Sequence, residues 1–269
     1  MSKPRILILR APGTNCDEET AYAFECAGGL PEVVHLNRFL ASPQLAAGFQ
    51  ILCIPGGFSY GDDVAAGRIF ANQIRHHLAD VLQDFRAAGK LMLGICNGFQ
   101  VLMKSGLLDT DDDQGPAASL AWNDSGRYLA RWVQLQTDGD QCVFLAGIDQ
   151  IFLPIAHAEG KFVARDEQSF AHFDESEQLV LRYTTIADEP GGENPDAHNY
   201  DAHHLDAYNP NGSVGDVAGM CDKTGRVFGL MPHPERFIDP TQHPQWTRLP
   251  EPPAGAGLKI FRNAVRYFS

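Results

Sequence analysis

The sequence lacks any apolar run of the roughly 20 residues needed to span a bilayer, so we expect no membrane association. Residues 1–5 and the short apolar stretch after them do not have the pattern of a signal peptide, which favours a cytoplasmic protein. The sequence also lacks an excess of positive charge: it has 21 Lys and Arg residues against 34 Asp and Glu residues, which gives a net charge of −13. Nucleic-acid-binding proteins present a basic surface, so we expect no nucleic-acid partner.

Paired cysteines are also missing. None of the six cysteines forms a Cys-x-x-Cys pair, which argues against zinc, and scattered cysteines are typical of reduced thiols in a cytosol. His198, His203 and His204 share a loop rich in Asp, Asn, Pro and Gly, but their spacing fits no tetrahedral ligand pattern, so we expect no metal. The phosphate-binding motif Gly-x-x-x-x-Gly-Lys-Ser/Thr does not occur, so we expect no cofactor on this chain.

The length of 269 residues and a hydrophobic content of 44% suit one α/β domain spanning residues 1–269. In the first part of the chain, apolar strands alternate with helices. The pattern predicts strands at 5–9, 32–36, 51–54 and 91–95, and helices at 15–27 and 69–88. This alternation predicts an open, mostly parallel sheet with helices on both faces.

After residue 127 the pattern changes to strands that follow one another without intervening helices. The predicted strands are 128–136, 141–144, 151–156 and 178–183, followed by a hairpin of 215–221 and 226–230 and a final helix at 257–268. We expect these strands to form an antiparallel extension.

The most informative stretch is the run from Leu91 to Gln100, in which an apolar strand enters the turn Gly94-Ile95-Cys96-Asn97-Gly98. It is the thiol counterpart of the Gly-x-Ser-x-Gly elbow, which presents a nucleophile between a strand and a helix. A cysteine there faces a helix N-terminus, whose partial positive charge favours the thiolate. The sequence therefore predicts that Cys96 is a nucleophile, and that the other five cysteines tolerate replacement.

A base for this nucleophile is found downstream, where His233 stands between Pro232 and Pro234. The prolines fix the backbone and exclude regular pairing, so His233 is held on a stiff support. Glu235, two residues on, projects to the same side if the segment is extended, and can then orient the imidazole. Cys96, His233 and Glu235 thus form a nucleophile, base and orienter.

With these two motifs the chain resembles the class I, triad-type glutamine amidotransferases. The runs at 11–17, 54–62, 155–160 and 209–214 make it similar, over nearly its whole length, to the glutaminase subunits of phosphoribosylformylglycinamidine synthase from purine biosynthesis. The resemblance implies a flavodoxin-like sheet. It also implies that Cys96 attacks the side-chain carbonyl of glutamine and forms a glutamyl thioester, which water hydrolyses to glutamate after ammonia has left.

The resemblance extends to the residues around the triad. It implies an oxyanion hole made by the backbone N–H groups of Gly57 and Asn97. It also implies contacts to glutamine from Gln100, His157, Glu159 and Gly160. Ammonia would pass to a partner synthase subunit that binds ATP and Mg²⁺ and converts formylglycinamide ribonucleotide to formylglycinamidine ribonucleotide, with a small bridging subunit as a further partner.

Three other interpretations stay open at this stage. The chain can be an amidotransferase subunit of a different synthase, against which the run Gly56-Gly57-Phe58-Ser59-Tyr60-Gly61-Asp62 argues. It can be a cysteine hydrolase of another superfamily, against which the His-Pro-Glu spacing argues. It can also be a non-catalytic regulatory subunit that keeps the fold, against which the complete Cys-His-Glu set argues.

Overall fold

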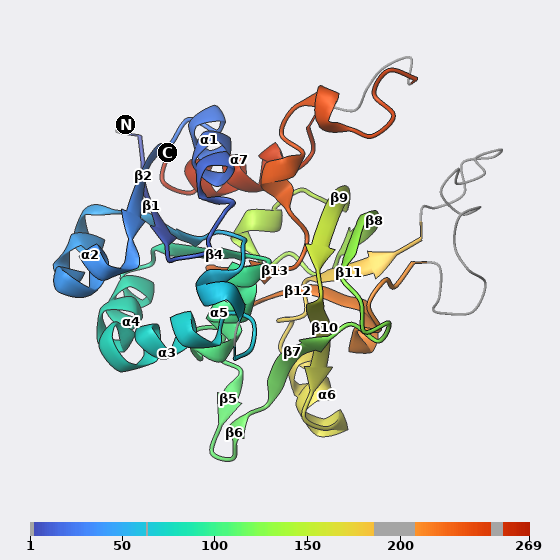
Figure 1. Cartoon of the computed structure of the whole chain (residues 1–269), viewed down its shortest axis with the longest axis horizontal. Coiled ribbons are helices and arrows are strands. Elements are labelled where there is room, and N and C mark those ends of the chain that lie inside the picture. The colour runs from blue at the N-terminus through green and yellow to red at the C-terminus, as the bar shows by residue number, and fades with distance from the viewer. Residues whose placement is uncertain (1–2, 63, 186–207, 249–254) are drawn as a thin grey trace.

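The computed structural model describes residues 3–62, 64–185, 208–248 and 255–269 (Figure 1). Our expectation about His198, His203 and His204 concerns residues outside this part of the chain. Among the residues described, no helix combines the length and the apolar character needed to cross a membrane.

A sheet of nine strands forms the centre of the molecule, in the order β2-β1-β3-β4-β13-β12-β11-β8-β9. Its first five strands are parallel, and the remaining strands pair antiparallel. The parallel strands are β1 (Arg5–Arg10), β2 (Leu30–His35), β3 (Ile51–Ile54), β4 (Leu91–Ile95) and β13 (Val227–Leu230). The antiparallel strands are β12 (Val217–Cys221), β11 (Leu181–Thr184), β8 (Leu129–Thr137) and β9 (Gln150–His157). The predicted parallel sheet with an antiparallel extension is confirmed.

Helices cover both faces of the parallel half (Figure 1). On one face α1 and α7 pack together, with the rings of Phe24 and Phe261 edge to face at 4.9 Å. On the other face α5 packs on β4 and β13. The helices are α1 (Asp17–Cys26), α2 (Leu36–Ala41), α3 (Arg68–His77), α4 (Ala79–Ala87), α5 (Asn97–Lys104), α6 (Glu167–Glu175) and α7 (Leu258–Arg266).

Two predicted elements are wrong. The single helix at 69–88 is two helices, α3 and α4, separated at Leu78, whose φ of −127° and ψ of 1° are not helical. Leu78 is fully buried at the break, so the apolar stripe continues through it and gives no sign of the interruption. The strand at 141–144 is replaced by a short 3₁₀ turn, Val143–Leu145, which places Phe144 against Phe228 at a ring distance of 5.7 Å.

Several short elements were not predicted. β7 (Ala118–Trp122) and β10 (Glu159–Ala164) form a separate antiparallel pair beside the main sheet. β10 follows β9 after a bend at Ala158, so the predicted turn at 157–160 is the junction of two strands. A hairpin of β5 (Asp111–Asp112) and β6 (Gly115–Pro116), together with α2 and α6, completes the set.

Candidate active site

The elbow forms as predicted, at the carboxyl edge of the parallel strands. β4 ends at Ile95, α5 begins at Asn97, and Cys96 between them has a φ of 52° and a ψ of −104°. Such backbone strain is typical of functional sites. A Cβ atom at Gly98 would lie 1.8 Å from the carbonyl oxygen of Ile54, so only glycine lets α5 approach β3 this closely. The sulfur of Cys96 is nearly buried and donates to the carbonyl oxygen of Ala156 at 3.7 Å.

His233 lies beside the elbow because β13 runs parallel to β4, with Leu230 paired to Ile95. The backbone N–H of His233 donates to the carbonyl of Pro154 at 2.8 Å, which ties the segment to β9. Its Nδ1 lies 2.6 Å from Oε1 of Glu235, and the two residues are 2% and 1% exposed. Glu235 reaches the ring through a 3₁₀ turn, Pro234–Arg236, and not through an extended segment.

The charges around His233 favour its protonated form. Burial by itself lowers the pKa of His233, but the Glu235 carboxylate and the sulfur groups of Cys96 and Cys16 raise it by more, so the pKa lies well above its ordinary value. Nε2 makes no hydrogen bond among the described residues. With Nδ1 bound to Glu235, Nε2 is the ring nitrogen available to the thiol and the substrate.

The glycine loop, residues 55–58, follows β3 and is fixed by the segment 12–16. The carbonyl of Gly56 accepts from the Cys16 N–H at 3.3 Å, and the Phe58 N–H donates to the carbonyl of Gly13 at 2.9 Å. Gly57 has a φ of +141°, which favours glycine. The side chain of Asn97 accepts from the Ser59 N–H at 3.3 Å, so the loop is joined to the first residue of α5. The structure thus places the two predicted oxyanion donors on connected segments.

Gln100 and Glu159 are also brought together, through bonds within the protein. The Gln100 amide accepts from the Asn97 side chain at 2.9 Å and donates to the Glu159 carbonyl at 2.6 Å. The Glu159 carboxylate lies 3.8 Å from Nζ of Lys104 and accepts from the Ala66 N–H at 3.5 Å. This network joins α5, β10 and the segment after the glycine loop. A contact of either side chain with glutamine stays a prediction.

His157, at the end of β9, is buried and neutral. Burial, and then the charge of His233, lower the pKa of His157 to about 3. Its Nδ1 lies 3.1 Å from Oδ1 of Asn123, whose amide nitrogen donates to the His157 carbonyl at 2.9 Å. The proton is therefore on Nδ1, and the buried Nε2 has no partner within the described chain. A Cβ atom at Gly160 would lie 2.3 Å from the imidazole, so glycine is required there.

One residue at this site was not predicted from the sequence. Cys16, the residue just before α1, is 1% exposed, and its sulfur lies within 4.8 Å of a ring nitrogen of His233 and a carboxylate oxygen of Glu235. The run at 11–17 is a family motif, but nothing in it indicates a contact with the base. We expected Cys16, like the four other cysteines besides Cys96, to tolerate replacement, but its contact with the base distinguishes it from those four.

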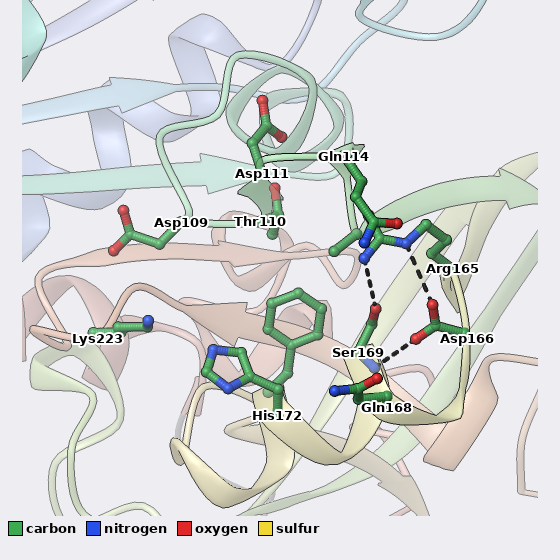
Figure 2. A pocket seen from close by; sticks show the side chains of 12 residues that line it. Asp109, Thr110, Asp111, Gln114, Arg165, Asp166, Gln168, Ser169, His172 and Lys223 are labelled. Atoms are coloured by element: carbon green, nitrogen blue, oxygen red, sulfur yellow. Dashed lines mark hydrogen bonds and ion pairs between the residues drawn. The ribbon is translucent and has the colours of Figure 1, made fainter.

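A separate pocket of about 390 Å³ lies away from the triad, between the β5–β6 region and α6 (Figure 2). Its walls carry charges of both signs, including Asp109, Arg165 and Lys223. Two of these charged groups form ion pairs within the protein, Arg165 with Asp166 at 3.4 Å and Asp109 with Arg86 at 2.6 Å. The pocket shares no lining residue with the triad or the glycine loop.

Comparison with known proteins places this chain in a family. Residues 3–268 match the CobB/CobQ-like glutamine amidotransferase domain. The PurQ subunit of phosphoribosylformylglycinamidine synthase from Dehalococcoides mccartyi is 46% identical over 268 residues, covering 99% of this chain and 98% of that protein. The subunit of the same name from Methanococcus maripaludis is 41% identical over 279 residues, covering 99% and 98%.

Solved structures agree with these matches. A chain in the structure of PurLQS from Thermotoga maritima aligns over the full length of both chains, with a TM-score of 0.72 and 29% identity. A glutamine amidotransferase from the same organism aligns over 100% of this chain and 98% of its own, with a TM-score of 0.53. Its identity of 14% shows a shared fold and no more.

Proposed function

The chain belongs to the CobB/CobQ-like glutamine amidotransferase family, and we propose that it is the subunit of phosphoribosylformylglycinamidine synthase that releases ammonia from glutamine. The observation that carries the catalytic assignment is the buried bond of 2.6 Å between His233 and Glu235, next to the strand that leads into the Cys96 elbow. A nucleophile, a base and a group that orients the base form a set suited to acyl transfer through a thioester.

The reaction follows from the geometry of these groups. The Cys96 thiolate adds to the side-chain amide carbon of glutamine, and protonated His233 gives its Nε2 proton to the departing nitrogen. Ammonia leaves and a glutamyl thioester remains. Neutral His233 then takes a proton from water as the water attacks the thioester, which releases glutamate and restores the thiolate–imidazolium pair. Glu235 stabilises the imidazolium at both stages.

We also propose roles for the residues that surround the triad. The backbone N–H groups of Gly57 and Asn97 stabilise the oxyanion, and each such donor typically contributes about 3 kcal/mol. The neutral Nε2 of His157, which has no partner among the described residues, is an acceptor suited to an N–H group of glutamine. Gln100, Glu159 and Gly160 shape the pocket through the network that joins α5 to β10.

The chemistry of this chain needs no cofactor of its own. We propose that ATP and Mg²⁺ bind to the synthase partner, and that a small bridging subunit joins the complex, as the combined name PurLQS of the similar Thermotoga structure suggests. We also propose that no metal takes part, because the guanidinium of Arg236 donates to the Cys16 sulfur at 3.2 Å and disfavours a cation beside the base. Purine synthesis of this kind is expected in the cytoplasm.

Reconstitution with a cognate synthase subunit tests the proposal. The wild-type complex should form formylglycinamidine ribonucleotide with either glutamine or ammonia, and the isolated synthase subunit should use ammonia only. Cys96→Ser should abolish the glutamine-dependent reaction and keep the ammonia-dependent one, and Cys26→Ser, at an exposed position of α1, is the control for loss of a thiol. A complex that binds this chain and still cannot use glutamine would refute the proposed function.

A further inference from the structure

A second thiol lies against the catalytic base without being the nucleophile. Cys16 is held between the His233 ring and the glycine loop: a Cβ atom at Gly56 would lie 3.1 Å from the Cys16 sulfur and 2.8 Å from the His233 ring. Cys16 and the base are both nearly inaccessible. The thiol is therefore part of the wall around the imidazole.

The hydrogen bonds of Cys16 identify it as a neutral thiol. The sulfur donates its proton to Oδ1 of Asn15 at 3.3 Å and accepts from Nη2 of Arg236 at 3.2 Å. Burial raises the pKa of the Cys16 thiol, although the neighbouring His233 and Arg236 oppose this. A neutral sulfur that accepts a hydrogen bond from a guanidinium is a weak partner for such a strong donor.

The Glu235 carboxylate acts electrostatically on the Arg236 guanidinium, but no hydrogen bond joins the two in the described part of the chain. Oε1 of Glu235 accepts a hydrogen bond from Nδ1 of His233, while Oε2 is buried and makes no hydrogen bond in the described part of the chain. Arg236, the next residue, instead donates to the Cys16 sulfur and, through Nε, to Glu19 at 3.1 Å. A guanidinium paired with Glu235 would compete with the imidazolium for the same negative charge.

We propose that Cys16 is a positioning residue of the triad, whose sulfur holds the Arg236 guanidinium away from Glu235 and so reserves the carboxylate for His233. The inference rests on the proposed function of Cys96, His233 and Glu235. It assigns to Cys16 a role that the other cysteines do not share, and it predicts that the role depends on hydrogen bonding and not on the sulfur itself.

We expect loss of the Cys16 sulfur to lower the pKa of His233. The titratable and charged groups that surround His233 come from several segments and are Cys16, Cys96, Tyr128, His157, Glu235 and Arg236. Of these, Glu235 contributes the main attraction for the imidazolium proton. If Arg236 moves onto Glu235, His233 holds its proton less tightly, and its pKa falls by about one unit, as expected for one rearranged charge pair.

Titration of His233 by ¹⁵N NMR in the full chain tests this directly, with its signal assigned by its loss in His233→Gln. Cys16→Ala should lower the measured pKa by about one unit. Cys16→Ser keeps a hydrogen-bond donor and acceptor at this position and should leave the pKa of His233 nearly unchanged. This variant can be titrated even if Cys16→Ala does not fold. The double variant Cys16→Ala/Arg236→Gln should recover most of this decrease and leave only the loss of the direct contribution that Cys16 makes to the pKa of His233. Cys26→Ala, at the other end of α1, is the matched control.

An unchanged pKa in Cys16→Ala would overturn the proposal. A decrease of the same size in Cys16→Ala/Arg236→Gln would also overturn it, since the displaced guanidinium would then not be the cause. In the reconstituted complex, the alkaline limb of the glutamine-dependent kcat/KM profile should move to lower pH by the same amount, with the ammonia-dependent rate unchanged. Failure of the wild-type complex to use glutamine would refute the proposed function alone, because the NMR titration does not depend on activity.

Discussion

Replacing Glu235 by glutamine keeps the size of the side chain and removes its charge at the centre of the site. The amide can place its oxygen toward Nδ1 of His233, which keeps the ring tautomer but leaves a buried NH₂ group where Oε2 has no partner among the described residues. Such an unsatisfied donor costs about 1–3 kcal/mol. The reverse orientation places NH₂ against Nδ1, which forces the ring proton onto Nε2 and removes the lone pair that faces Cys96.

Both orientations weaken the base. We expect glutamine-dependent turnover to fall by about 10² to 10⁴, which corresponds to about 3–5 kcal/mol of activation free energy. Burial lowers the pKa of His233 and the Glu235 charge is the largest of the effects that raise it, so the pKa falls when that charge is lost. The imidazolium then deprotonates at lower pH, and the alkaline limb of the rate profile moves to lower pH.

The assay is the pH profile of glutamine-dependent synthesis by the reconstituted complex, with the ammonia-dependent rate measured in parallel as a control for assembly. His233→Ala should cost more than Glu235→Gln, because the base itself is lost. Glutamine-dependent turnover at the wild-type level by Glu235→Gln across the pH range would remove Glu235 from the triad and refute this reasoning.

Three further predictions concern other parts of the chain. His157 stays neutral in the folded state down to about pH 3, whereas in the unfolded chain it takes up a proton near pH 6.5. The free energy of unfolding should therefore rise with pH between these two values, and His157→Gln should reduce the slope of this rise by about 1.4 kcal/mol per pH unit in urea unfolding. Asp222→Ala breaks a buried contact with Arg86 at 3.1 Å and should cost about 3 kcal/mol by denaturant unfolding, against less than about 1 kcal/mol for the exposed Asp138→Ala. The isolated chain should release glutamate slowly and accelerate when the synthase and its nucleotide substrate bind, if a peptide of the glycine loop rotates on docking; unchanged turnover would exclude this gating and leave the triad intact.

The inner strands of the parallel half were predictable because they are buried on both faces. Ile51–Ile54 and Leu91–Ile95 are short apolar runs bounded by polar residues, proline or cysteine, and both were predicted with the observed limits. The break at Leu78 was not predictable, since the buried residue at the break continues the helical stripe. The pairing of β7 with β10 depends on contacts between remote segments, which local patterns do not contain.

At the active site, too, residues in local sequence motifs were predictable and contacts between remote segments were not. Cys96 and His233 are found in short motifs whose glycines and prolines dictate the backbone, so their sequence signal is strong. Gln100 and Cys16 have no such signal, because their surroundings are assembled by folding: Gln100 reaches the carbonyl of Glu159, and Cys16 reaches Arg236, 220 positions away in the chain. Where remote segments meet at the sheet edge, residue identity alone did not reveal the contacts.

If Cys96 forms a glutamyl thioester, rapid acid quenching of the complex during turnover of radiolabelled glutamine should trap that intermediate. After proteolysis, the label should reside on the peptide that contains Cys96, and it should be absent from a Cys96→Ser complex that still uses ammonia. Label on a peptide carrying another cysteine, such as Cys16, or glutamine-dependent synthesis that survives Cys96→Ser, would show that Cys96 is not the nucleophile.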